Sequence, residues 1–277
     1  MFAKRAMLVE LTIRQWTARK HDKSASNTVK NAHQVAGDGG KYNKLLIAKE
    51  ALERINRVAN ELRRTHYRFT LPWGDKGQHL LPARLFMDYR QAIDAYRQEF
   101  QEEVDAFISR YDLWVNGARA RLGTLFDPSD YPPANEVRSR FGVHLDIFPV
   151  PEAGDFRVEV AKEEREELIA NIQAASQHRQ AEANKACYVR VREVLERMKN
   201  QCTVERSRIT EALVEDVRDL TQVMDDLNVN EDPELSRITR EIRDGLVFQA
   251  DDLRKSPALR KEAQDRASTI LESLSWS

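Results

Sequence analysis

Apolar and polar residues alternate in two short stretches of the first third of the chain. Val9, Leu11 and Ile13 are separated by polar residues, and a similar alternation runs over residues 67–71. A period of two is typical of a strand with one buried face. The pattern therefore predicts two strands, over residues 9–16 and 67–71, that could pair with each other.

Between these stretches the periodicity stops. Residues 20–44 are rich in Ser, Asn and Gly and include five lysines, a composition typical of a loop. A loop of this length in a compact domain is usually functional or disordered, and a flexible basic segment can order along a phosphate backbone. We expect a long cationic loop here.

Two helices and a second hairpin follow from the spacing of apolar residues. Residues 45–65 are predicted to form an amphipathic helix with one cationic face. Residues 84–122 carry aromatic residues at steps of three and four, which indicates a helix with a core-facing stripe. Alternation over residues 143–147 and 156–160 predicts a second hairpin.

The last part of the chain reads as helical. Residues 162–227 lack Pro and Gly and have helical spacing, which predicts one very long helix or a pair with a break near residues 177–185. Asp232 and Ser256 each precede a proline, and a capping residue followed by Pro at the first helical position starts a helix.

The predicted fold is α+β and helix-dominated, with a small antiparallel sheet, packed helices and a long C-terminal helical region. We predict two domains. Residues 1–160 form a basic α+β nucleic-acid-binding core, and residues 161–277 form a helical bundle or hairpin. Long apolar stripes in the second region favour a homo-oligomer.

Charge is distributed unevenly along the chain. The 277 residues have a net charge of -1, but residues 1–90 carry 18 Lys and Arg against 8 Asp and Glu. Such a split suggests that one region meets a polyanion. The alternative is that the two parts neutralise each other within the fold.

Composition also bears on the compartment. No apolar run approaches the roughly 20 residues that span a bilayer, and the N-terminal stretch lacks a signal-peptide cleavage site. Cys187 and Cys202 lie on one helical stretch, about 22 Å apart at 1.5 Å per residue, too far for a disulfide. We expect a cytoplasmic protein without membrane contact.

Motifs for catalysis are weak. The Gly37 to Lys41 segment lacks the spacing of a phosphate-binding loop, and the histidines and cysteines lack metal-ligand spacing. Asp146, Glu159 and Lys162 could form a nuclease-like site, but Glu159 and Lys162 do not have the spacing of neighbours on one strand face. The sequence predicts no catalytic residues, cofactor or metal, and a metal-dependent nuclease stays a minor alternative.

Cationic and aromatic side chains are interleaved in the first third. Lys and Arg neutralise phosphates, and aromatic rings stack on unpaired bases for about 1–3 kcal/mol each. This mixture suits single-stranded nucleic acid, although Tyr67 and Trp73 could instead be core residues. The candidate binding residues are Trp16, Arg19, Lys20, Lys23, Lys30, Lys41, Tyr42, Lys44, Arg63, Arg64, Tyr67, Arg68, Trp73 and Lys76.

Pro, Gly and aromatic residues form a distinctive pattern: Leu71-Pro72-Trp73, Gly74, Gly77, Leu81-Pro82, Asp130-Tyr131-Pro132, Phe141, Pro149-Val150-Pro151 and Phe156. In this pattern the chain resembles a family of uncharacterised proteins encoded by phages and mobile elements, which a phage would express in the host cytoplasm. The chain is also similar to the type of single-stranded-DNA-binding cofactor that assists RNA polymerase in lytic phages. The resemblance implies sequence-independent binding and a polymerase partner, and transfers no functional residue.

The predicted function is therefore sequence-independent binding of single-stranded DNA, as a transcription cofactor for a phage RNA polymerase. A different class of function is a structural or adaptor protein of phage assembly with a helical oligomerisation interface.

Overall fold

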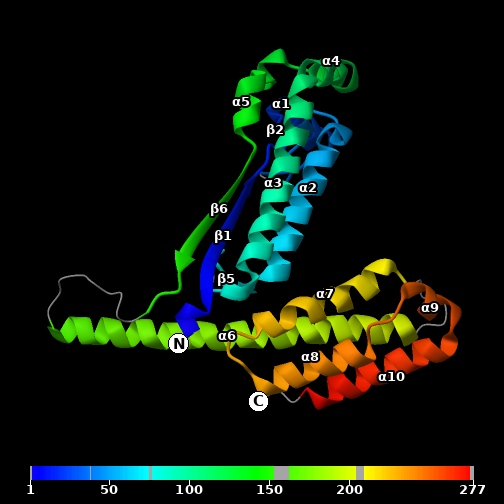
Figure 1. Ribbon diagram of the computed structural model, residues 1–277. Helices are drawn as coiled ribbons and strands as arrows, with labels where there is room; N and C mark the ends of the chain where they lie inside the picture. The colour runs from blue at the N-terminus through cyan, green and yellow to red at the C-terminus, as the bar shows by residue number, and fades with distance from the viewer. Residues whose placement is uncertain (1, 38, 75–76, 153–161, 204–208, 275–277) are drawn as a thin grey trace. The chain divides into compact units, whose positions relative to one another are not determined.

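The computed structural model describes residues 2–37, 39–74, 77–152, 162–203 and 209–274 (Figure 1). It confirms a helix-dominated α+β fold with a small antiparallel sheet and a long C-terminal helical region. The chain forms two compact units. The bundle unit comprises Met1–Glu10, His66–Arg90 and Asp146–Ser277, and the ribbon unit comprises Leu11–Thr65 and Gln91–Leu145.

The main sheet has four strands in the order β4-β5-β1-β6. Strand β1 pairs antiparallel with β5, with Ala6 opposite Pro82 and Val9 opposite His79. Strand β5 also pairs antiparallel with β4. The strand bounds are Ala6–Arg14 for β1, Leu71–Pro72 for β4, His79–Pro82 for β5 and Gly142–Pro149 for β6.

The predicted strand over residues 67–71 is wrong, because helix α2 spans Lys49–Phe69. Three alternating residues fit a helix as well as a strand when they continue an amphipathic run. The helix stops before Pro72, whose ring disfavours helical backbone at Leu71. Strand β1 therefore pairs with β5 and β6 instead. Residues 156–160, the second half of the predicted hairpin, lie outside the described residues.

The carbonyl groups at the end of α2 are capped by an arginine from α6 (Lys162–Thr203). Arg190 donates to the carbonyl oxygens of Tyr67, Arg68 and Thr70 at 2.7–3.0 Å. These carbonyls have no partner within the helix, so a cation here satisfies them and meets the negative end of the helix dipole. Burial lowers the pKa of Arg190.

Helices α7 to α10 complete the bundle unit, with α7 and α10 packed on α6 (Figure 1). Helix α6 is continuous across residues 177–185, where a break was one alternative. Its Val191, Leu195 and Met198 are buried. The bounds are Glu211–Leu227 for α7, Pro233–Gly245 for α8, Ala250–Lys255 for α9 and Pro257–Ser273 for α10.

Both predicted helix starts in this region are confirmed. The Asp232 carboxylate accepts from the backbone N–H groups of Glu234 and Leu235 at the start of α8. The Ser256 hydroxyl accepts from the N–H of Leu259 at the start of α10. Each cap satisfies donors that a helix leaves open at its first turn.

The ribbon unit contains the rest of α2, packed beside α3 (Phe86–Ser109), and the helices α4 (Tyr111–Leu122) and α5 (Ala134–Ser139). Arg57 pairs with Glu99 at 2.9 Å across α2 and α3. The predicted helix over residues 84–122 is therefore two helices, broken at Arg110. Its aromatic stripe is core, as expected, with Phe107 against Tyr111.

Two histidines of the bundle unit lie side by side: His66 of α2 is buried, and His79 of β5 is half-buried. His66 Nδ1 lies 2.8 Å from the Tyr89 hydroxyl, and the His66 and His79 rings are 4.6 Å apart. Burial lowers the pKa of His66 to about 3, and the charge on His79 adds to this. Burial also lowers the pKa of His79, with a smaller effect of Arg190. Both rings are therefore neutral in the folded protein near neutral pH.

These histidines should weaken the fold in acid. The folded-state pKa of His66 lies below its ordinary value of 6.5, so the unfolded chain binds more protons between pH 6.5 and about 3, and stability falls as pH falls through this window. Replacing His66 with Asn keeps a polar group near Tyr89 and removes the titration. We expect the pH slope of the unfolding free energy to decrease by up to about 1.4 kcal/mol per pH unit. Urea unfolding at pH 4 to 7 measures this.

The matched control is His33→Asn at an exposed position. If the His66→Asn and wild-type curves stay parallel throughout this range, His66 is not a source of acid sensitivity.

Candidate nucleic-acid interface

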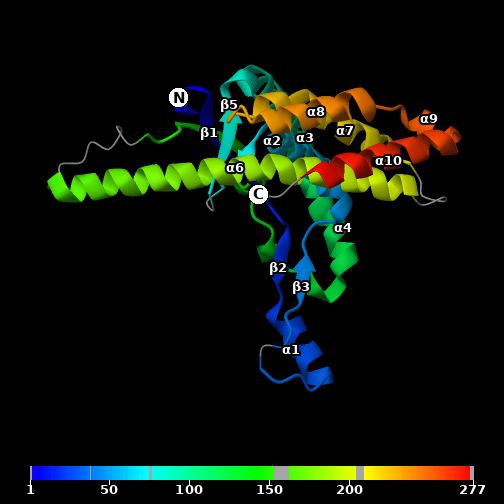
Figure 2. The same cartoon turned by 90° about the horizontal axis from the view of Figure 1, so that it is seen from below.

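Residues 19–45, here called the cationic lobe, contain six of the candidate cations. Strands β2 (Arg19–His21) and β3 (Asn43–Leu45) form an antiparallel ribbon in which Lys20 lies opposite Lys44. Helix α1 (Lys23–Ala32) follows β2 at the end of the ribbon (Figure 2). The predicted continuous loop over residues 20–44 is therefore wrong for helix α1 and for the ends of the segment, which form β2 and β3. The glycine-rich segment connects α1 to β3.

Helix α1 was not predicted because its sequence is mostly polar, but its capping residue is recognisable in the sequence. The Asp22 carboxylate accepts from the backbone N–H of Ala25 at 2.9 Å and caps the helix. Ser26 then donates to the carbonyl of Asp22 and accepts from the N–H of Tyr42. An Asp just before a run without Pro or Gly is typical of a helix start. The bonds of Ser26 connect α1 to the strand that follows it.

Lys44 is not part of the binding surface. Its ammonium group lies 2.6 Å from a carboxylate oxygen of Asp130, 3.0 Å from one of Asp22 and 2.8 Å from the carbonyl oxygen of Leu125. The side chains of Lys44 and Asp130 are only 6% and 2% exposed. This buried ion cluster joins the lobe to the loop after α4. Lys20 also pairs with Asp130.

The electrostatics of the ion cluster favour its charged form. Burial acts to lower the pKa of Lys44, but its contacts with Asp130 and Asp22 outweigh burial, and the pKa is raised. The pKa of Asp22 is lowered, first by the N–H of Ala25 and then by Lys44. A buried charge persists when partners of opposite charge surround it.

Three cations of the lobe remain open to solvent. Arg19, Lys23 and Lys41 are exposed and form no ion pair with any residue that the structure describes. The side chain of Lys20 is half exposed despite its pair with Asp130. Lys30 donates to the carbonyl of Gly37 at 2.6 Å, and its remaining donors are available. The lobe can therefore offer several cations to a phosphate chain.

Tyr42 is the exposed aromatic residue of the lobe. It is 40% exposed, and its backbone is fixed on both sides, because its N–H donates to Ser26 and its carbonyl accepts from the N–H of Asp22. A ring presented from a fixed backbone loses little conformational freedom when a base stacks on it.

Both candidate tryptophans are core residues. Trp16 is 7% exposed and packs against Phe107 and Tyr111. Trp73 is 2% exposed and stacks on Phe2, with ring centroids 6.0 Å apart. Neither ring has a face open to a base. For Trp73 this is the core alternative noted from the sequence.

The remaining candidates are spread over both units. Arg63 and Arg64 lie on the part of α2 in the ribbon unit, where Arg63 donates to Gln15. Tyr67 and Arg68 belong to the bundle unit. Tyr67 is 54% exposed, whereas Arg68 pairs with Asp219 at 3.0 Å. Lys76 lies outside the described residues. The structure thus brings together Arg19, Lys20, Lys23, Lys30, Lys41 and Tyr42.

Catalytic candidates gain no geometric support. Within the described ranges, no three His, Cys, Asp or Glu side chains are grouped to hold a metal ion. Of the nuclease-like set, Glu159 and the side chain of Lys162 fall outside these ranges. Burial raises the pKa of Cys187 to about 12, which makes its thiol unreactive. No described helix is both long and apolar enough to cross a membrane.

Comparison with known proteins does not add a relative: no family model, curated protein or solved structure matches the chain.

The ion cluster should hold the lobe in place. Lys44→Met removes the buried ammonium but keeps the length of the side chain, and leaves Asp130 in the interior with only Lys20 beside it. Breaking a buried pair costs about 3–5 kcal/mol, and we expect about 2–3 kcal/mol here because Lys20 remains. The free energy of unfolding in urea measures this loss.

Lys41→Met is the matched control, because Lys41 lies three residues away, is exposed and forms no ion pair with a described residue. Equal unfolding free energies for the two variants would show that the ion cluster adds no net stability.

Proposed function

We propose that the protein binds single-stranded DNA, without sequence preference, through the cationic lobe. The observation that carries this proposal is the grouping of exposed Arg19, Lys23 and Lys41 with the exposed ring of Tyr42 on one small ribbon–helix unit. Cations release counterions from phosphates, and a sequence-tolerant ring stacks on any unpaired base.

The setting proposed for this binding is transcription by a phage RNA polymerase. Its ground is the resemblance to the phage cofactor type, which couples DNA binding to a polymerase partner. Co-purification with the polymerase decides this wider proposal, and its absence leaves the DNA-binding proposal intact. The long apolar stripe of α6 gives little support for a homo-oligomer, because α7 and α10 of the same chain pack against it.

Charge removal in the lobe should weaken binding in a salt-dependent way. We expect the triple variant Arg19→Gln, Lys23→Gln, Lys41→Gln to lose three phosphate contacts, which lowers the slope of log affinity against log salt by about 2 and the affinity at 0.1 M salt by about 100-fold. Fluorescence anisotropy with a labelled single-stranded oligonucleotide, over a salt series, measures both quantities.

The control variant is Arg165→Gln, Lys255→Gln, Lys261→Gln, which removes the same charge from exposed positions of the bundle unit. Equal weakening in both triple variants would mean that net charge, and not the lobe, governs binding. Absence of binding by the wild type at low salt would refute the proposal, and tighter binding of the duplex would reject single-strand selectivity.

Tyr42 distinguishes an unpaired strand from any other polyanion. Tyr42→Ala removes one stacking ring and should weaken binding to the single strand by about 1–3 kcal/mol. Tyr42→Phe retains the ring and should bind like the wild type, since the contacts of Tyr42 to Ser26 and Asp22 use its backbone. Duplex affinity, measured by the same titration, should not change in either variant. A Phe variant as weak as the Ala variant would exclude stacking as the role of this ring.

A further inference from the structure

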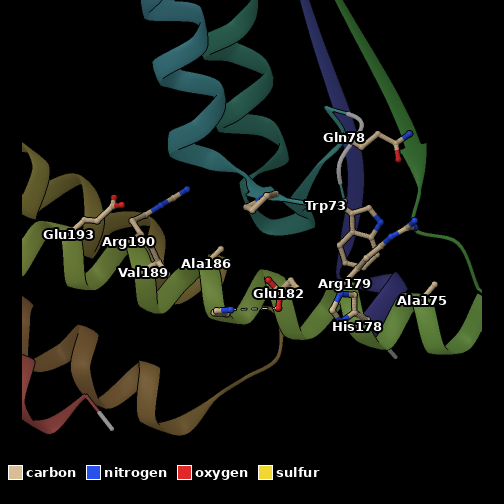
Figure 3. A pocket seen from close by; sticks show the side chains of 13 residues that line it. Trp73, Gln78, Ala175, His178, Arg179, Glu182, Ala186, Val189, Arg190 and Glu193 are labelled. Atoms are coloured by element: carbon tan, nitrogen blue, oxygen red, sulfur yellow. Dashed lines mark ion pairs between the residues drawn. The ribbon is translucent and has the colours of Figure 1, made fainter. Parts of the chain in front are cut away.

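The turn between β4 and β5 forms an open groove with α6 in the bundle unit (Figure 3). The groove has a volume of about 850 Å³, and Trp73, Gln78, Arg179 and Lys185 are among its lining residues. A smaller hollow of about 510 Å³ adjoins it and shares Trp73 and Arg179 as walls. All of these residues belong to the bundle unit, so this site shares no residue with the cationic lobe.

The smaller hollow is suited to an aliphatic group. Its walls include Leu168, Ile172 and Ala175 of α6 and Pro151. The ring of Trp73 also lines it, but is 2% exposed and already stacked on Phe2. These walls offer no exposed aromatic ring on which a nucleobase could stack. A branched aliphatic side chain would bury its apolar surface against them.

Arg179 and Trp73, which line both the hollow and the groove, each carry a hydrogen-bond donor without an acceptor among the described residues. The side chains of Arg179 and Trp73 lie beside each other (Figure 3). A Cβ atom on Gly74 would be 3.5 Å from Arg179 Nε, so the guanidinium group lies against the turn. Arg179 has no ion-pair partner, and the buried Trp73 Nε1–H donates to no acceptor, among the described residues. A carboxylate at this point would pair with Arg179 and offer the acceptor that the indole lacks.

The length and charge of the groove indicate which kind of ligand would carry this carboxylate. The hollow and the groove together follow α6 from Leu168 to Glu193, about 37 Å at 1.5 Å per residue, a length that suits an extended chain. Lys185 and Arg190 also line the groove, but Lys185 pairs with Glu182 at 3.9 Å and Arg190 donates to the backbone carbonyl oxygens at the end of α2. With Glu193 as a further lining carboxylate, Arg179 is left to pair with a single carboxylate, which suits a singly charged ligand better than a polyanion.

We propose that this groove binds an extended peptide segment of a partner protein. An aliphatic side chain of the peptide occupies the hollow beside Leu168 and Ile172, and a neighbouring carboxylate of the peptide pairs with Arg179. This activity goes beyond DNA binding, because it uses other residues and a singly charged motif.

The test is a titration of a fluorescein-labelled peptide, Gly-Gly-Leu-Glu-Gly-Gly with an amidated C-terminus, followed by anisotropy. We expect about tenfold weaker binding when the peptide Glu is replaced by Gln or its Leu by Ser. The Arg179→Gln protein should bind the Glu and Gln peptides equally. Arg165→Gln, on the same helix but outside the lining residues, should keep the preference of the wild type. In a ¹⁵N–¹H spectrum, the Trp73 indole signal should shift with the Glu peptide and not with the Gln peptide.

Four results would overturn the proposal. The first is no binding of the peptide at 1 mM. The second is a preference for Glu over Gln that persists in Arg179→Gln. The third is binding of octanoate without binding of the peptide, which would assign the groove to a free aliphatic acid. Affinity for single-stranded DNA, measured on the same Arg179→Gln protein, should equal that of the wild type. A loss of DNA affinity in place of peptide affinity would also overturn it.

Discussion

The ammonium group of Lys44 is buried in the ribbon unit, and the arrangement of the cationic lobe depends on its neutralisation. Asp22 and Asp130 provide the opposite charges at 3.0 and 2.6 Å. Asp22 is also the cap of α1, so one residue fixes both the start of the helix and the position of β3. Asp130 comes from a distant part of the chain, after α4. A small polar lobe with little apolar core is thereby held by charge and hydrogen bonds.

The charge asymmetry of the sequence has two structural outcomes. Several cations of the first ninety residues meet acidic partners within their own unit, as Arg57 does with Glu99 and Arg68 with Asp219. Neutralisation within the fold, the alternative considered from the sequence, therefore accounts for part of the asymmetry. Arg19, Lys23 and Lys41, which share the lobe, stay exposed and form no ion pair within the part of the chain that the structure describes. The net charge of the first third overstates the available charge, and its distribution is more informative.

Local signals predicted the parts of the fold that depend on neighbouring residues. The caps at Asp232 and Ser256 and the helix ending at Phe69 follow from capping chemistry and a period of 3.6 residues, although the end of the helix was placed too early. The pairing of β1 with β5 was missed, since β5 is short and its partner is distant in sequence. Register and pairing depend on contacts between remote residues, which a pattern of local hydrophobicity does not contain.

The candidate site shows the same limit. Lysines at positions 41 and 44 look equivalent in the sequence, yet one is exposed and the other is buried, because only the folded chain brings Asp130 to Lys44. The cap at Asp22 could have been recognised from its position before a helical run. The role of Asp130 could not be recognised from the sequence, because Asp130 is far from Lys44 along the chain.

Aromatic residues between cations were the strongest signal for an unpaired strand, and burial divides them into two kinds. Tyr42 keeps an open ring because its contacts to Ser26 and Asp22 use its backbone. The ring of Trp73 is stacked on Phe2 and is not open to a base. Its indole N–H lies beside Arg179 and has no acceptor among the described residues. The lobe presents several free cations and a flat ring, which suits a repeating polyanion. Among the described residues that line the groove, Lys185 and Arg190 already have partners and Arg179 does not, which suits a ligand with one negative charge. Similar pairs of an aromatic residue and a cation therefore select different partners, according to which atoms the fold leaves exposed.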